Sequence, residues 1–226
     1  MLNQFITLDR KTKAKWLLYA THIAVWIPLV ILFFDFWYHR LGPEPIRQVT
    51  RRTGEWALIF LLGSLAITPL NIVFGWKQLF PLRKWLGLYA FMYVCLHLLS
   101  FVGLDYQFAW GFIIEEITRR YYAIVGFAAF LILLPLAATS SKWAMRKLRK
   151  NWRRLHRLVY LAGLLGVIHF ALSVKNAYTE PAMYGLLLAL LLLIRVTPIK
   201  KRLLKLRQRI KPKPKRSTTR KTVSPT

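Results

Sequence analysis

The sequence has few acidic residues and almost no cysteine. Cys95 is the only cysteine among 226 residues, so no intrachain disulfide forms, and we expect a small buried thiol inside an apolar helix. Asp and Glu number 8 against 35 Lys and Arg, a formal net charge of +27. Such a charge can indicate nucleic-acid binding. Here the cations lie between and after long apolar runs, as cationic flanks of membrane helices do, so we predict no nucleic-acid partner.

Long apolar runs dominate the chain. It is 56% hydrophobic, with a mean hydropathy of +0.37, which is too apolar for an ordinary soluble domain. Runs of about 20 apolar residues indicate transmembrane helices, and Trp and Tyr mark many of their ends, as in interfacial belts. The six predicted spans are residues 16–34, 56–74, 85–104, 121–139, 155–174 and 182–196.

The distribution of charge predicts the orientation. Lys and Arg gather before the first span, in the second and fourth connections and after the last span, whereas every acidic residue except Asp9 lies on the opposite side. Both termini are therefore predicted to be cytoplasmic. The predicted fold is all-α, with a basic cytoplasmic segment at 1–15, a six-helix transmembrane domain at 16–197 and a basic, disordered cytoplasmic tail at 198–226. The start of that tail, residues 200–210, has the pattern of a basic amphipathic helix lying on anionic lipid.

Four histidines lie inside the predicted spans: His22 in the first, His97 in the third, and His156 and His169 in the fifth. An ionisable ring at membrane depth is costly and normally functional, and imidazole is a common axial ligand of haem iron. Both spans run outward, and His97 and His169 lie at similar distances before their outer ends, hence at nearly the same depth. Two facing imidazoles predict one six-coordinate haem, which favours electron transfer over oxygen binding.

Small residues near His169 leave room for a flat macrocycle. Ala162 and Gly166 share its face of the fifth span, and Gly163 adds space nearby. The same small residues would also let helices pack closely, so both interpretations stay open.

The other histidines have no facing partner at their depth. His156 lies about 20 Å along the helix axis from His169, near the cytoplasmic surface. It either ligates a second haem with a non-histidine partner, binds a quinone or flavin, or caps the membrane interface. His22 and His39 are interpreted as satisfied or interfacial side chains.

Three segments resemble the MsrQ (YedZ) family of haem-binding membrane subunits, which belongs to the ferric reductase-like transmembrane group. They are TGEWALIFLLGSLAITPL from residue 53, LRKWLGLYAFMYVCLHLLSF around His97, and WRRLHRLVY with the later HFALSVK. The resemblance covers residues 53–175.

This resemblance implies a conduit in the bacterial inner membrane. The conduit would take electrons from the quinone pool and pass them through haem b, one or two groups, to MsrP, a soluble periplasmic molybdopterin enzyme. That partner would reduce methionine sulfoxide in oxidised periplasmic proteins, so no catalytic residue is expected here. The resemblance puts the haem-linked histidines at His97, His156 and His169, and it adds FMN as a cofactor. The basic inner residues Arg83, Arg153 and Arg154 are candidates for binding FMN or quinone.

Two other functions compete with this hypothesis. The first is a stand-alone transmembrane haem reductase of ferric chelates or oxygen, which needs an open haem edge at the outer surface. The second is a transporter or scaffold whose histidines relay protons, which predicts no haem; the lack of Asp and Glu in the spans argues against a proton pump. About 30 residues after the last span are too few for flavin and nicotinamide domains, so we expect electrons from quinol or another protein.

Overall fold

The regular elements are all helices in the part of the chain that the structure describes. The computed structural model describes residues 9–174 and 178–210. Five helices or helix series there are long and apolar enough to cross a membrane: Arg10–Trp37, Pro45–Phe74, Lys77–Asp105, Tyr121–Ala138 and Lys150–Ser173. The pair Thr179–Leu193 and Thr197–Arg209 passes the same test only as a bent unit. The predicted all-α, multi-pass bundle is confirmed, with five spans or six.

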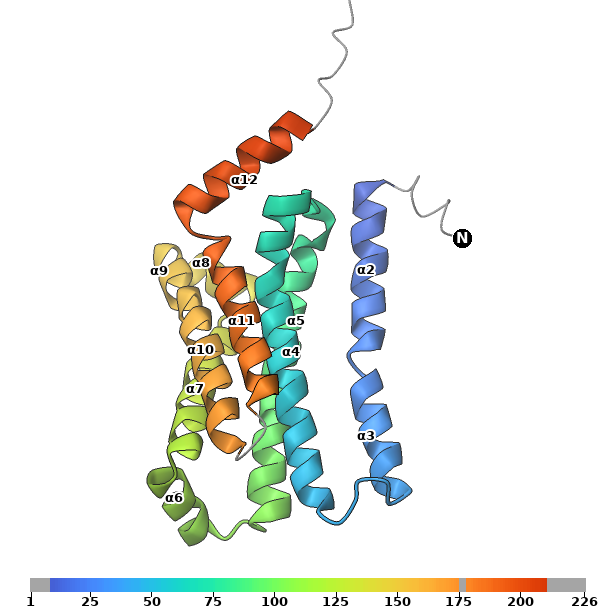
Figure 1. The fold of residues 1–226 in the computed structure, drawn as a ribbon, viewed down its shortest axis with the longest axis vertical. Helices are drawn as coiled ribbons and strands as arrows, with labels where there is room; N and C mark the ends of the chain where they lie inside the picture. Colours follow the sequence, from blue (N-terminus) through green and yellow to red (C-terminus); the bar gives the residue numbers. More distant parts are fainter. Residues whose placement is uncertain (1–8, 175–177, 211–226) are drawn as a thin grey trace, which may run out of the picture.

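Helix α4 (Pro45–Phe74) is the central helix of the bundle (Figure 1). Of its most apolar stretch 56% is buried, against 11% or 17% for the other four spans. Its leucines face different neighbours: Leu58 and Leu65 pack with Val167 and Leu188, whereas Leu61 packs with Ala90. This helix therefore packs against α3 (Ile27–Trp37), α5 (Phe80–Leu99), α10 (Val159–Ser173), α11 (Thr179–Leu193) and α12 (Thr197–Ile210).

The first span is broken rather than continuous. It consists of α2 (Arg10–Ala24) and α3 (Ile27–Trp37), where residues 16–34 were predicted as one helix. Pro28 explains the break, because it has no N–H to donate to the carbonyl of Ala24 and its ring crowds that carbonyl.

Two segments predicted as outer loops are largely helical. Helix α4 begins at Pro45, eleven residues before the predicted start at residue 56, and residues 110–119 of the predicted loop 106–120 form α6 (Trp110–Arg119).

The third span joins the 3₁₀ turn η1 (Lys77–Leu79), α5 (Phe80–Leu99) and the π-helical turn η2 (Ser100–Asp105). Helix α7 (Tyr121–Ala138) ends one residue before the predicted span 121–139 does.

The connection after α7 is also helical. It contains α8 (Lys142–Leu148) and α9 (Lys150–Leu155), separated by Arg149 with a φ of +46°. The turn η3 (His156–Leu158) leads into α10 (Val159–Ser173). Helix α11 (Thr179–Leu193) then bends by 75° into α12 (Thr197–Ile210). The predicted amphipathic helix at 200–210 is thus confirmed, and residues 211–226 of the predicted tail lie outside the described residues.

The bundle has two distinct ends. One end, here called the α6 end, holds α6 with the start of α4 and the close of α10; the other, the α12 end, holds α12 and the start of α2 (Figure 1). The two ends of the described chain thus lie at the same end of the bundle.

Cys95 is exposed on the surface of the bundle, so the prediction of a buried thiol is wrong. Tyr93, two residues before it on α5, is fully buried. At about 100° per residue, Cys95 points to nearly the opposite side of the helix, away from the core.

Candidate haem site

The structure brings the imidazole rings of His97 on α5 and His169 on α10 together, with their planes nearly perpendicular. Their ring centroids lie 5.9 Å apart, and the ring planes cross at 81°. The two residues are far apart in sequence, so their meeting depends on the packing of α5 and α10 around α4. The predicted pairing at one depth is therefore found in the structure.

Each imidazole is anchored through the same ring nitrogen. Nδ1 of His97 lies 2.8 Å from the carbonyl oxygen of Thr50, and Nδ1 of His169 lies 2.7 Å from that of Tyr122. A carbonyl only accepts, so both Nδ1 atoms carry the proton and donate it. Each Nε2 then keeps a free lone pair, which is the state that a metal requires.

The spacing of the rings fits a single iron between them. A histidine nitrogen lies about 2 Å from its metal, and the ring centroid about 1 Å further away. Two rings on opposite sides of one iron therefore have centroids about 6 Å apart, close to the 5.9 Å found here.

A cavity of about 1060 Å³ contains the pair. This volume is slightly above the usual range for cofactor sites, about 300–1,000 Å³. Ala162 and Gly166 line it, in agreement with the predicted room for a macrocycle. Gly163 does not, because a side chain there would meet Leu65 and Leu188 instead. The wall is otherwise largely apolar, and its aromatic members are Phe101, Tyr106, Tyr122, Phe127, Phe130 and Phe170.

Charged residues line the cavity at the α6 end. The first turns of α4 contribute Arg47 and Arg51, and the last residue of the third span contributes Asp105. Arg51 pairs with Glu180 of α11 at 2.8 Å, with both side chains about half exposed. Guanidinium groups at the opening suit the two carboxylates that a haem carries.

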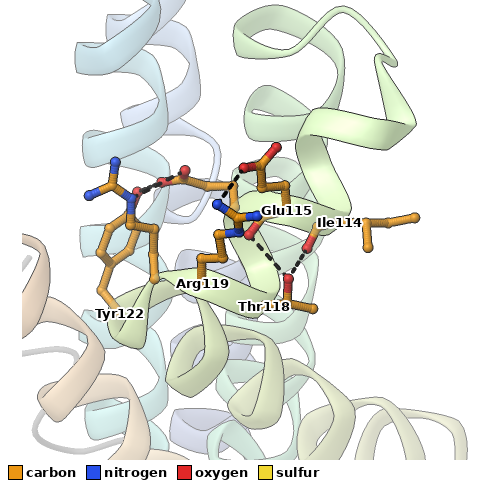
Figure 2. A network of polar contacts seen from close by, with 7 residues as sticks. Ile114, Glu115, Thr118, Arg119 and Tyr122 are labelled. Carbon is orange, nitrogen blue, oxygen red and sulfur yellow. Dashed lines mark hydrogen bonds and ion pairs between the residues drawn. The ribbon is translucent and has the colours of Figure 1, made fainter.

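A polar network covers the adjacent surface of α6 (Figure 2). Arg119 pairs with Glu115 at 3.1 Å, and the hydroxyl of Tyr122 donates to Glu116. Burial, followed by the charge of Glu116, raises the pKa of the Tyr106 hydroxyl above its usual range. Tyr122 thus has two contacts: its backbone carbonyl accepts from His169, and its hydroxyl donates to Glu116 of α6.

His156 is placed apart from this pair. Its Nε2 lies 3.0 Å from the hydroxyl of Thr139, and its ring stacks on Trp152 with centroids 4.0 Å apart. Arg83 is near enough to interact with it electrostatically, whereas Arg153 and Arg154 are exposed on α9. In the described ranges no three His, Cys, Asp or Glu side chains cluster as they would around a metal ion held by protein ligands alone. A second haem at His156 stays a prediction.

The remaining two histidines lie away from the pair. His22 has its Nδ1 2.5 Å from the hydroxyl of Tyr89 and an edge contact with Trp85. His39 is exposed in the turn after α3, with a φ of +54°.

Sequence reasoning missed the residues that hold the two rings. These are Thr50 and Gly54 on α4, and Tyr122 and Gly126 on α7. A glycine inside a helix costs about 1 kcal/mol relative to alanine. Both glycines lie inside helices of otherwise good helix-forming residues. Their cost in helix stability was therefore the sequence signal that could have marked these two positions as functional.

Comparisons with known proteins agree with this geometry. Residues 53–167 match the family model for the ferric reductase like transmembrane component. The chain is 49% identical over 186 residues to the protein-methionine-sulfoxide reductase heme-binding subunit MsrQ of Rhodospirillum rubrum, covering 81% of this chain and 88% of that protein. It is 47% identical over 179 residues to the MsrQ of Xanthomonas campestris, covering 76% and 82%. No solved structure matches it.

Proposed function

Because this chain belongs to the MsrQ family of heme-binding subunits, within the ferric reductase-like transmembrane group, we propose that it is the haem b electron-transfer subunit of a methionine-sulfoxide reductase system. Electrons would pass from the quinone pool of the bacterial inner membrane to MsrP, a periplasmic molybdopterin reductase that repairs oxidised proteins. A single observation carries this proposal. His97 and His169 face each other at 5.9 Å, and both Nε2 atoms are left free by the hydrogen bonds of Nδ1.

Two histidine ligands favour electron transfer over substrate binding at the metal. A haem held by both rings would supply reversible one-electron chemistry, with no iron position open to oxygen or a ferric chelate. The residues themselves contribute position: α4, α5, α7 and α10 fix both rings inside a mostly apolar cavity. This arrangement supports electron transfer, and the family relationship favours the conduit over the stand-alone reductase.

The charge distribution supports an orientation in which the α6 end faces the periplasm. The α12 end carries the cations of α8, α9 and α12, whereas acidic residues such as Asp105 and Glu180 lie at the α6 end. Cations concentrate on the cytoplasmic side of membrane proteins. Electrons would then leave at the α6 end, beside the opening of the cavity.

The α12 end is the proposed side of electron delivery. His156, Arg83, Arg153 and Arg154 are all at this end, and their cationic groups suit a quinone oxygen or the phosphate of FMN. Helix α12 has exposed Lys and Arg side chains and bends by 75° from α11. We assign it to the surface of the cytoplasmic leaflet, where anionic lipid headgroups attract a basic amphipathic helix.

A reduced-minus-oxidised visible spectrum of the purified, detergent-solubilised protein tests the proposal, with haem extracted and counted. We expect a sharp, six-coordinate b-type spectrum that a quinol analogue also produces. One haem per chain would leave His156 without an iron, and two would assign it one. A folded preparation without haem, from cells grown with ample iron, would refute the proposal and favour the transporter or scaffold.

The rate at which the reduced haem is reoxidised, with and without MsrP, distinguishes the two haem-based functions. The conduit is expected to reoxidise much faster with MsrP and methionine sulfoxide than with a ferric chelate or oxygen. The opposite order would favour the stand-alone reductase.

A further inference from the structure

We infer that Gly54 and Gly126 are positioning residues: by having no side chain, they let each imidazole reach a helix carbonyl and so set the crossing angle of the two rings. This inference rests on the proposed haem site. It concerns one glycine on α4, beside His97, and one on α7, beside His169. Neither glycine binds the metal.

The first observation is the space that these glycines leave. A Cβ added to Gly54 would lie 2.9 Å from Nδ1 of His97, and one added to Gly126 would lie 2.6 Å from Nδ1 of His169. Carbon and nitrogen in van der Waals contact are about 3.5–4.0 Å apart. Any side chain at either position would therefore push the ring away.

The second observation is the shared register of each glycine and its carbonyl. His97 donates to Thr50, four residues before Gly54, and His169 donates to Tyr122, four residues before Gly126. In an α-helix the carbonyl of residue i already accepts from the N–H of residue i+4. Its second lone pair points outward beside the side chain of that residue. A glycine at i+4 exposes this lone pair to the imidazole.

The other glycines do not have this environment. A Cβ at Gly63, Gly87 or Gly166 would make only ordinary contacts of 3.5–3.7 Å with a leucine or serine side chain. These three fit the general role of small residues in close helix packing. Among all the glycines of the chain, Gly54 and Gly126 are the two whose added Cβ would meet a histidine ring.

The orientation of the rings follows from this arrangement. The two accepting carbonyls belong to different helices, so the rings are held from different directions and their planes cross at 81°. Ferric iron between nearly perpendicular imidazoles gives a highly anisotropic low-spin EPR signal with a large gmax, whereas parallel imidazoles give a rhombic signal. The wild-type protein is expected to show the large-gmax signal.

The test compares Gly54→Ala and Gly126→Ala with Gly63→Ala, a control on α4 whose added methyl would lie 3.7 Å from Leu86. Haem content, ferric EPR and the midpoint potential are measured on the purified proteins. We expect haem affinity to fall about tenfold in the first two variants, as for lost hydrogen-bonding partners of metal ligands, with a shifted gmax in the haem that remains. The control should match the wild type. Unchanged haem content and gmax in all three variants would overturn the inference.

A second measurement avoids any dependence on the folding of the alanine variants. In His169→Gly, added imidazole should restore the low-spin spectrum, because it can donate to the Tyr122 carbonyl beside Gly126. 1-Methylimidazole lacks that N–H and carries a methyl where the helix passes, so it should bind about tenfold more weakly. Equal affinity of the two bases would overturn the inference. Absence of haem in the wild type would instead refute the proposed function.

Discussion

The two ends of the bundle use the same kinds of residue in different ways. At the α6 end, His97 and His169 donate Nδ1–H to carbonyls and keep Nε2 free in a cavity. At the α12 end, Nε2 of His156 meets the hydroxyl of Thr139. The hydrogen-bonded ring nitrogen therefore differs between the two ends: it is Nδ1 in His97 and His169, and Nε2 in His156.

Two arginines at the α12 end, Arg195 and Arg207, donate to backbone carbonyls of α4. Pro69 removes the N–H that would bond the carbonyl of Leu65 inside α4, and Arg195 donates to that carbonyl and to the hydroxyl of Tyr160. Freed backbone groups at membrane depth need such substitutes. At the α6 end, backbone carbonyls thus hold the two imidazoles, whereas at the α12 end an arginine satisfies a backbone carbonyl of α4.

The largest expected effect is the loss of either facing histidine. His97→Ala or His169→Ala removes one of the two proposed iron ligands, and we expect haem per chain to fall by more than about tenfold, since lost outer-shell partners alone cost about 10–100-fold in metal affinity. A pyridine haemochrome assay on the purified variants measures this. His22→Ala is the matched control, because His22 contacts Tyr89 and not the cavity. Full haem in both variants would mean that the pair is not the site.

A smaller effect is expected for His156→Ala, which tests the other side of the comparison. The haem between His97 and His169 should keep its spectrum, because His156 contacts neither ring. Reduction by a quinol analogue should slow, whereas reduction by dithionite should not. Equal loss of both would show that the two ends are not independent.

The pairing of His97 and His169 was predictable from the sequence, because it depends on the depth of each residue in its span and on the direction of the two spans. A bilayer demands about 20 apolar residues per span, and the rise per residue then puts His97 and His169 at one level. Their ring orientation depends on carbonyls of α4 and α7, and no local pattern shows which helices lie beside them. Gly54 and Gly126 were missed for that reason.

The N-terminal extension of α4 was missed for a different reason. Residues 45–55 are polar and were interpreted as a loop, but Arg51 pairs with Glu180, and Arg52 pairs with Asp35 at 2.5 Å. These pairs connect the extended helix to α11 and α3. Long-range partners of this kind are not visible in hydropathy.

The third prediction concerns stability rather than haem. Arg195→Met leaves the Leu65 carbonyl without its donor and the Tyr160 hydroxyl without its partner. We expect a loss of about 1–2 kcal/mol in the free energy of unfolding, with haem content unchanged. Thermal unfolding of the detergent-solubilised protein measures it. Pro69→Ala supplies the N–H that the Leu65 carbonyl lacks, so in that background Arg195→Met should lower the free energy of unfolding by less. An equal loss of stability in both backgrounds would contradict this account.

The smallest expected effect is at the junction of α12 and α4. Arg207 donates to the carbonyls of Asn71 (2.7 Å) and Ile72 (3.1 Å) in the last turn of α4, and its guanidinium lies against Gly75. A cation at a helix C-terminus contributes about 0.3–1 kcal/mol, so Arg207→Ala should loosen α12 without unfolding α4. Hydrogen exchange should then rise in residues 197–210 and stay the same at the α6 end, while Arg202→Ala, an exposed cation on the same helix, changes neither. Faster exchange around His97 and His169 would show that α12 reaches the haem site through α4, and the contrast between the two ends would have to be abandoned.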